Sequence, residues 1–147
     1  AGQNLLLGEL SKAANPVTPV SMGRAMELAR EWGERLQLKQ ISDRARMIEL
    51  SGGNQQKVVI AKSLIQEPKL IIFDEPTRGV DVGAIVEIHK LIHDLADQGL
   101  AVVVISSYLP EIMAVSDRIL VAKRGRVVEE MLASEADEAA IMFAAVH

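Results

Sequence analysis

The chain has 147 residues, of which 49% are apolar, and a formal net charge of −4. This size and apolar content favour one folded domain over a disordered chain. Interspersed acidic and basic residues exclude a general nucleic-acid or anionic-membrane surface, and the lack of cysteine excludes disulfides, thiol nucleophiles and cysteine-bound zinc. The longest strongly apolar run, residues 100–105, is too short to span a membrane, and no signal peptide is expected.

The first third of the chain is expected to hold one helix before a glycine-rich motif. Residues 1–20 are weakly patterned, and Pro16 and Pro19 indicate a loop. A helix is predicted over residues 21–36 with Ser21 as its N-cap. Its apolar positions recur at helical spacing, at Met22, Ala25, Met26, Ala29, Trp32 and Leu36. Residues 37–49 are expected to be irregular.

The middle of the chain predicts a strand–helix–strand unit. A helix over residues 54–65 should end before Pro68, and a short apolar strand should follow over residues 70–73. An amphipathic helix is predicted over residues 82–96, followed by a second apolar strand over residues 100–105. Because both strands are continuously apolar, we expect them to be buried on both faces of a parallel sheet.

The last third predicts a hairpin between two helices. A short helix is expected over residues 110–115 and a strand over residues 119–122. The turn at residues 123–126 contains Gly125, and residues 127–129 should form the returning strand. We expect Ser134 to cap a final helix. Acidic residues in its first turn would oppose the positive end of the helix dipole, at Glu135, Asp137 and Glu138.

Ser51, Gly52 and Gly53 form the first candidate site. Glycines before a helix let the backbone approach a ligand closely and adopt positive φ, and they aim N–H groups at an anion. Ser51 adds a hydroxyl donor. The other reading is a glycine-rich helix start without a ligand, and this short motif alone does not separate the two.

Asp74 and Glu75 form the second candidate site. Acids at the end of a buried strand lie at the carboxyl edge of the sheet, where α/β folds bind ligands. Neighbouring strand residues face opposite sides, so one acid could hold Mg²⁺ through water while the other positions a nucleophilic water. The other reading is a pair of solvated charges at a strand end. Asp81, six residues further on, reads first as the N-cap of the next helix.

Two further clusters favour structural readings. His89 and His93 have the i, i+4 spacing of zinc ligands, but Lys90 stands where a metalloprotease helix would carry glutamate. The basic residues at 123–126 fit a solvated turn better than a phosphate site.

Together these motifs resemble the nucleotide-binding domain of ABC transporters. The family's signature, L-S-G-G-x-Q, is matched by residues 50–55, and its Walker B strand by residues 70–74. Glu75 matches its catalytic glutamate, and residues 80–81 match its D-loop. The resemblance covers about residues 45–130, and the helix over residues 22–36 is similar to the helical subdomain. Further segments look like the second cassette of ribose- and galactose-type importers, at residues 54–58, 78–84 and 106–111.

The chain departs from the family pattern in two ways. It contains no G-x-x-x-x-G-K-[ST] Walker A loop and no glutamine loop, and it does not begin with Met, so we expect a fragment of a longer protein. Ser107 stands where the family usually carries its switch histidine. A serine is neither a cation nor an imidazole base near neutral pH, which implies a weak or inactive site.

The resemblance implies an α/β, partial P-loop NTPase fold with a parallel sheet flanked by helices. Residues 1–50 would be a helical-subdomain remnant and lead-in, and residues 51–147 the C-terminal part of the cassette. ATP and Mg²⁺ are the implied cofactors. Asp74 would hold the metal and Glu75 would be catalytic. The other nucleotide contacts would come from Ser51, Gly52, Gly53, Gln55 and Asp81.

The resemblance also implies partners and a place in the cell. The partners would be a second cassette and transmembrane permease subunits, on the cytoplasmic face of the bacterial inner membrane, with no nucleic acid. The chain would complete no ATP site by itself and would show no ATPase activity. An uncovered sheet face predicts self-association or strand exchange. The alternatives are a non-catalytic docking module and an ABC ATPase not coupled to transport.

Overall fold

The computed structural model describes residues 2–12, 22–36 and 46–147. The described elements run in the order α1 (Gly2–Lys12), α2 (Met22–Arg35), the 3-10 turn η1 (Met47–Glu49), α3 (Gly52–Leu64), β1 (Leu70–Asp74), α4 (Val82–Asp97), β2 (Ala101–Ile105), α5 (Leu109–Val115), β3 (Arg118–Lys123), β4 (Arg126–Leu132) and α6 (Glu138–Val146). They form two compact units. One joins Ala1–Ile71 to Thr77–Val102, and the other joins Ile72–Pro76 to Val103–His147.

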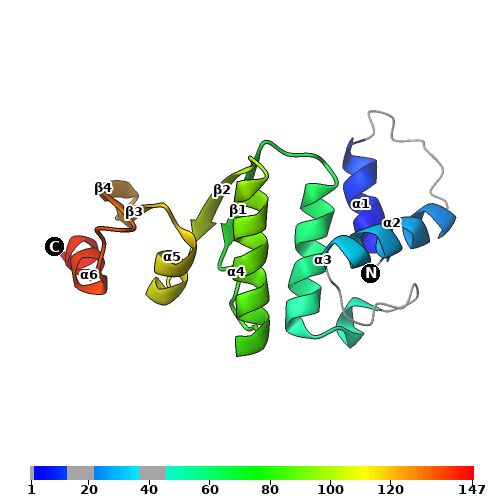
Figure 1. Ribbon diagram of the computed structural model, residues 1–147, viewed down its shortest axis with the longest axis horizontal. Helices are drawn as coiled ribbons and strands as arrows, with labels where there is room; N and C mark the ends of the chain where they lie inside the picture. Colours follow the sequence, from blue (N-terminus) through cyan, green and yellow to red (C-terminus); the bar gives the residue numbers. More distant parts are fainter. Residues whose placement is uncertain (1, 13–21, 37–45) are drawn as a thin grey trace. The chain divides into compact units, whose positions relative to one another are not determined.

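The first unit is built on three packed helices, α1, α2 and α3 (Figure 1). Their shared core contains Leu5 from α1, Trp32 from α2 and Val58 from α3, all buried. The weak pattern of residues 1–20 gives no prediction of a helix, and α1 forms there over Gly2–Lys12. Packing against α2 and α3 stabilises a segment whose own periodicity is slight.

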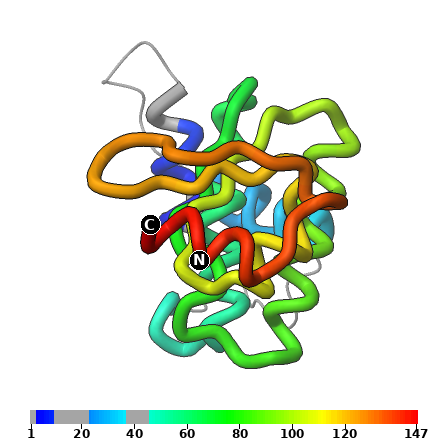
Figure 2. Tube along the Cα trace, turned by 90° about the vertical axis from the view of Figure 1, so that its left-hand side faces the viewer, coloured from blue at the N-terminus to red at the C-terminus, as the bar shows by residue number. Residues whose placement is uncertain are grey.

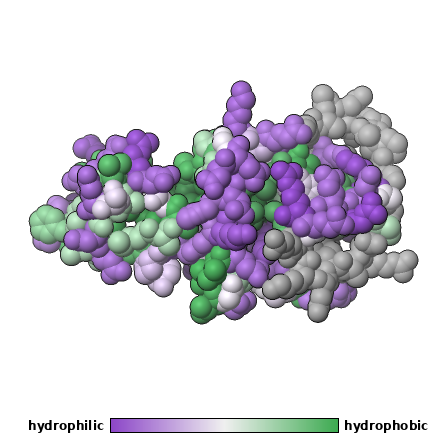
Figure 3. All heavy atoms as spheres, in the orientation of Figure 1, coloured by the Kyte–Doolittle hydropathy of each residue, from purple (hydrophilic) through white to green (hydrophobic). Residues whose placement is uncertain are grey.

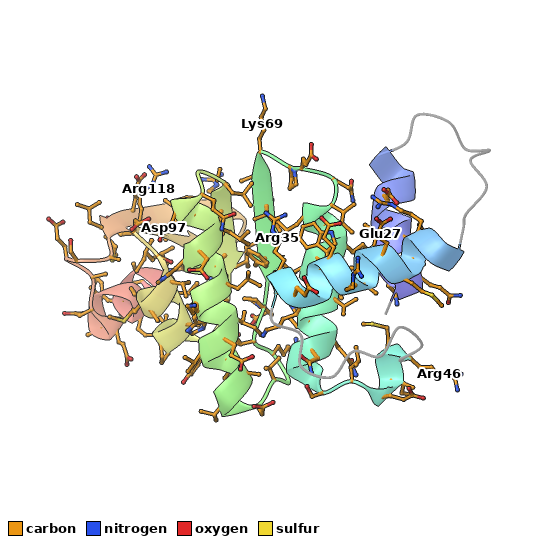
Figure 4. The ribbon with its side chains drawn as sticks, turned by 45° about the vertical axis from the view of Figure 1, so that its right-hand side comes forward. Glu27, Arg35, Arg46, Lys69, Asp97 and Arg118 are labelled. Carbon is orange, nitrogen blue, oxygen red and sulfur yellow. The ribbon has the colours of Figure 1, made fainter. Side chains whose placement is uncertain are left out.

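Helix α2 confirms the sequence prediction. It covers Met22–Arg35 and buries Ala25, Ala29 and Trp32 of the predicted apolar face. Arg35 at its C-terminal end, labelled in Figure 4, places its guanidinium over the Trp32 ring, with 4.8 Å between Cζ and the ring centroid. Arg24 donates to Glu9 of α1 at 2.6 Å and to Glu27 at 2.8 Å, which raises the pKa of the guanidinium above its ordinary value. The predicted cap Ser21 and the predicted loop at Pro16 and Pro19 lie outside the described residues.

β1 and β2 form a parallel pair joined through α4. Ala101 at the start of β2 donates its N–H to the Lys69 carbonyl at 3.1 Å, and Glu75 after β1 donates to the Ile105 carbonyl at 2.8 Å. Each strand start therefore pairs with a strand start, and each end with an end. Lys69 and Asp97 lie toward the same edge in Figure 4, so α4 runs back antiparallel to β1.

The expectation that both strands are buried on both faces was wrong. Ile71 and Phe73 of β1 are buried, but Ile72 between them is 57% exposed, and Val103 and Ile105 of β2 are 43% and 53% exposed. Exposure alternates along each strand, so one face of this sheet is covered and the other is open. A continuously apolar run is buried on both faces only when both faces are covered.

The C-terminal elements form a hairpin that packs on a helix. β3 and β4 pair antiparallel, with Ile119 opposite Met131. Arg124 and Gly125 both have positive φ, 49° and 76°, which fits the tight hairpin turn predicted there. Figure 2 shows α6 alongside the two strands, where Ile141 joins the small core.

The start of the final helix differs from the prediction. Asp137, and not Ser134, caps α6, with its Oδ1 accepting from the Ala140 N–H at 2.6 Å. Glu138 remains in the first turn as expected, while Glu135 lies before the helix. Ser134 lies in the turn that follows β4, where the Glu135 N–H donates to the Leu132 carbonyl at 3.0 Å, so the helix begins three residues later than predicted.

Candidate functional site

The signature residues Ser51 to Gly53 form the start of α3. Ser51 is the N-cap, and its Oγ accepts from the Asn54 N–H at 3.4 Å. The helix was predicted to begin at Asn54, and it begins two residues earlier at Gly52. Both glycines are therefore part of the first helical turn, with Ser51 and Gly52 exposed to solvent.

The first turn of α3 presents N–H groups that suit an anion. The first backbone bond of the helix runs from the Gln55 N–H to the Ser51 carbonyl at 2.9 Å, and the Gly52 and Gly53 N–H groups precede it. Such N–H groups, together with the helix dipole, favour negative charge. The side-chain amide of Gln55 donates to the Leu50 carbonyl at 2.9 Å, so the last residue of the motif is hydrogen-bonded to the first.

The two glycines are required by close packing and not by their backbone conformation. Among the described glycines, positive φ occurs at Gly79, Gly99 and Gly125 only, so Gly52 and Gly53 do not use the positive φ that glycine allows. A Cβ at Gly52 would lie 3.2 Å from the Gly79 carbonyl oxygen. A Cβ at Gly53 would lie 2.5 Å from the Ala84 Cβ. The start of α3 thus fits directly against the loop before α4 and against its first turn.

Asp81 is the N-cap of α4, as predicted. Its Oδ1 accepts from the Ala84 N–H at 3.0 Å, and its side chain is exposed. Figure 3 shows apolar surface at this end of α4, where Val82 is 80% exposed and Val86 is 66% exposed. One compact unit therefore brings Ser51, Gly52, Gly53 and Asp81 together.

Asp74 and Glu75 stand at the carboxyl end of β1. Asp74 is the last residue of the strand and is exposed, and Glu75 follows with a φ of 49°. A non-glycine residue in this left-handed region carries strain of about 1 kcal/mol or more. Two hydrogen bonds hold Glu75 there, from its own N–H to the Ile105 carbonyl at 2.8 Å and from the Ser107 N–H to its Oε1 at 2.9 Å.

Ser107 contacts the Glu75 carboxylate through the backbone N–H of Ser107. Sequence reasoning considered only the Ser107 side chain and missed this N–H donor, because any residue except proline would supply it. The neighbouring Ser106 hydroxyl accepts from the Tyr108 N–H at 3.1 Å and so orders the turn after β2. The second unit therefore gathers Asp74, Glu75 and Ser107.

The donor set at the end of β1 fits a water-coordinated magnesium ion better than a metal held by protein alone. Within the described residues, no group of three or more His, Cys, Asp or Glu side chains could hold a metal. His89 and His93 therefore do not form a zinc site with a third described ligand. Mg²⁺ often takes one carboxylate, several waters and substrate phosphates, and the exposed Asp74 suits that role.

Comparison with known proteins identifies relatives of this chain. A family model described as ABC transporter matches residues 3–78, which extends the resemblance well before residue 45. The chain is 44% identical over 144 residues to a ribose import ATP-binding protein, RbsA, of Caldanaerobacter subterraneus subsp. tengcongensis. It is 53% identical over 114 residues to a xylose import ATP-binding protein, XylG, of Geobacillus kaustophilus. These alignments cover 98% and 78% of this chain but only 29% and 23% of the relatives.

Solved structures agree on the fold. An ATP-binding cassette of an ABC transporter, MJ1267, matches with a TM-score of 0.74 at 27% identity, covering 96% of this chain and 61% of that one. The dimeric bacterial ABC transporter cassette MJ0796 matches with a TM-score of 0.69 at 27% identity, covering 88% and 56%. Among the described residues, every helix is too short or too polar to cross a membrane. The chain therefore belongs to the ABC transporter family and has the α/β fold of part of its ATP-binding cassette.

Proposed function

We propose that this chain is part of the ATP-binding subunit of a sugar importer and that it presents the start of α3 to a nucleotide on a second cassette. The names of the relatives, ribose and xylose import ATP-binding proteins, support the transport role. The N–H groups of Gly52 and Gly53 in the first turn of α3, which begins at the exposed residues Ser51 and Gly52, are the observation that carries the nucleotide role.

At this site the chain would stabilise the terminal phosphate of ATP. N–H donors already held in place by the helix need no reorganisation when charge develops on phosphate oxygens. Each such charge interaction at a helix start contributes about 0.3–1 kcal/mol. Gln55 would support the motif through the Leu50 carbonyl, and Asp81 would contribute from the D-loop beside it.

Asp74 and Glu75 would serve a different nucleotide, together with a Walker A loop that this sequence lacks. When bound, Mg²⁺ would neutralise charge on the phosphate oxygens. Asp74 would hold the ion through water, and Glu75 would orient a nucleophilic water. Ser107 offers Glu75 a backbone N–H but no imidazole, which supports a weak or inactive site.

We further propose that residues 1–50 act as the helical lead-in and residues 51–147 as the C-terminal part of the cassette. The proposed partners are a second cassette and transmembrane permease subunits. The proposed location is the cytoplasmic face of the bacterial inner membrane. The parent protein would be an ATPase coupled to transport, while this chain alone would have no ATPase activity.

Two assays test this function. The purified chain should hydrolyse ATP no faster than a Glu75→Gln variant, and turnover that depends on Glu75 would overturn the proposal. The chain should also bind a Walker A-bearing cassette from a sugar-import relative only when ATP is present, as measured by calorimetry. Binding that is equally strong without nucleotide would favour a docking module instead.

A further inference from the structure

Lys57 is a buried cation that joins the signature helix to the next helix. It lies on α3 with only 4% of its surface exposed. Its Nζ donates to the Glu87 Oε2 on α4 at 2.7 Å, while the Glu87 side chain is 42% exposed. Removing an ammonium group from water is costly unless a partner compensates, so the pair must be well placed to be tolerated.

The ion pair lies beside a steric contact between the same two helices. Lys57 follows Gly53 by four residues, and Glu87 follows Ala84 by three, so each pair of positions shares a helix face. Gly53 and Ala84 are too close for another carbon atom between them. We call Gly53, Lys57, Ala84 and Glu87 the α3–α4 clamp. Its steric contact sets the separation of the helices, and its ion pair sets their register along the axis.

A pair of apolar side chains would hold the two helices together without the free-energy cost of removing charged groups from water. Replacing a buried ion pair with apolar side chains is often neutral or stabilising, so net stability does not explain Lys57 well. A directional bond, in contrast, distinguishes one register from its neighbours. α3 and α4 lie side by side with their N-termini at the same end (Figure 1), so their register decides where the Gly52 and Gly53 N–H groups point relative to Asp81.

We propose that Lys57 is a positioning residue, which fixes the phosphate-facing start of α3 against the start of α4 through Glu87. This inference rests on the proposed function, since the position of Gly52 and Gly53 matters only if they meet phosphate. A displacement of about 1 Å in a positioning group can cost on the order of a hundredfold in rate. The effect of Lys57 should therefore be seen in nucleotide-dependent binding more than in folding.

The test compares four variants with a matched control. Lys57→Met removes the charge and keeps most of the volume, Glu87→Gln weakens the bond from the more exposed side, and Lys57→Arg keeps the charge. The double variant Lys57→Glu with Glu87→Lys reverses the pair. The control is Lys90→Met on α4, whose partner Asp94 is 3.9 Å away at an exposed site. All are measured below their unfolding midpoints.

The first measurement is ATP-dependent binding to a Walker A-bearing cassette. Lys57→Met should weaken it by about tenfold or more, and Glu87→Gln by less. Lys57→Arg and the reversed pair should recover most of the binding, and Lys90→Met should stay within about twofold of the wild type. If the wild type binds with ATP and Lys57→Met binds equally well, the inference is overturned.

The second measurement does not depend on nucleotide. The chain has no cysteine, so single cysteines at the exposed positions Val59 on α3 and Val86 on α4 can carry spin labels. The distance distribution between the labels should be narrow in the wild type and in Lys57→Arg, and broader or shifted in Lys57→Met. An unchanged distribution overturns the inference. A changed distribution in a chain that shows no ATP-dependent binding would leave the clamp standing and remove the proposed function.

Discussion

The start of α3 and the end of β1 both carry proposed nucleotide contacts, but different interactions hold them. At α3, the buried Lys57 and the close contact of Gly53 with Ala84 fix the motif through side chains and packing. At β1, Asp74 is exposed, and Glu75 is held by two hydrogen bonds that involve backbone N–H groups. Substitutions at the first site should therefore act through side-chain fit, whereas the second site should tolerate most changes at Ser107.

We expect the largest effect from the sheet formed by β1 and β2, because one face of this sheet is open. If a second copy covered roughly 500 Å² of apolar surface, the stabilisation would be on the order of 10 kcal/mol. The chain should therefore self-associate or exchange a strand, as measured by light scattering.

A paired substitution tests which surface is responsible. Changing both Ile72 and Val103 to lysine should reduce self-association, because both side chains lie on the open face. The control is Val127→Lys on β4, which is 60% exposed and lies outside that face. A monodisperse wild-type monomer would contradict this prediction.

Packing at the start of α3 should show the next effect. Gly53→Ala should lower the free energy of unfolding by about 1–3 kcal/mol, because the new Cβ meets the Ala84 Cβ. Adding Ala84→Gly should restore most of the loss, because it removes the Ala84 Cβ while the opposite helix-propensity changes of the two substitutions nearly cancel. Chemical denaturation measures both.

Gly33→Ala on α2 is the control for helix propensity. Among the residues that the structure describes, no atom outside the neighbouring backbone of α2 lies within 4 Å of a Cβ built at Gly33, so this change should stabilise the chain by about 0.5–1 kcal/mol. If Gly53→Ala raised the free energy of unfolding as Gly33→Ala does, the close contact of α3 with α4 would not limit the side chain at position 53.

Loss of a helix cap should cost about 1 kcal/mol in unfolding free energy. Asp81→Ala removes an acceptor 3.0 Å from the Ala84 N–H, and Ser51→Ala removes one 3.4 Å from the Asn54 N–H. The shorter, charged bond at Asp81 should make its loss the larger of the two. Equal or reversed costs in thermal unfolding would show that hydrogen-bond length does not rank these caps.

The side chain of Ser107 should matter least. Ser107→Ala keeps the N–H that binds Glu75 and should change the unfolding free energy by less than about 0.5 kcal/mol. Glu75→Ala removes the acceptor and should cost about 1 kcal/mol. A larger effect from Ser107→Ala than from Glu75→Ala would show that the serine hydroxyl, and not the backbone, organises this strand end.

Helix α4 and strand β1 show how far sequence reasoning reached. The helix was predicted over residues 82–96 and covers Val82–Asp97, because its cap at Asp81 and its apolar spacing are local signals. The strand was also placed well, at Leu70–Asp74, but its burial was not. A run of apolar residues indicates a strand without indicating how many of its faces are covered.

Local patterns were thus sufficient to locate the signature motif, the acids after β1, the D-loop cap and the hairpin turn. Local patterns were not sufficient to predict the tertiary contacts that hold these features in place. Position 53 requires glycine because Ala84 packs against it. Lys57 is tolerated in the interior because its Nζ lies 2.7 Å from the carboxylate of Glu87, which is 30 residues away in the sequence. Glu75 accepts from a backbone N–H that is 32 residues further along the chain. Caps and periodicity act within one or two helical turns, whereas these contacts exist only after distant segments have packed.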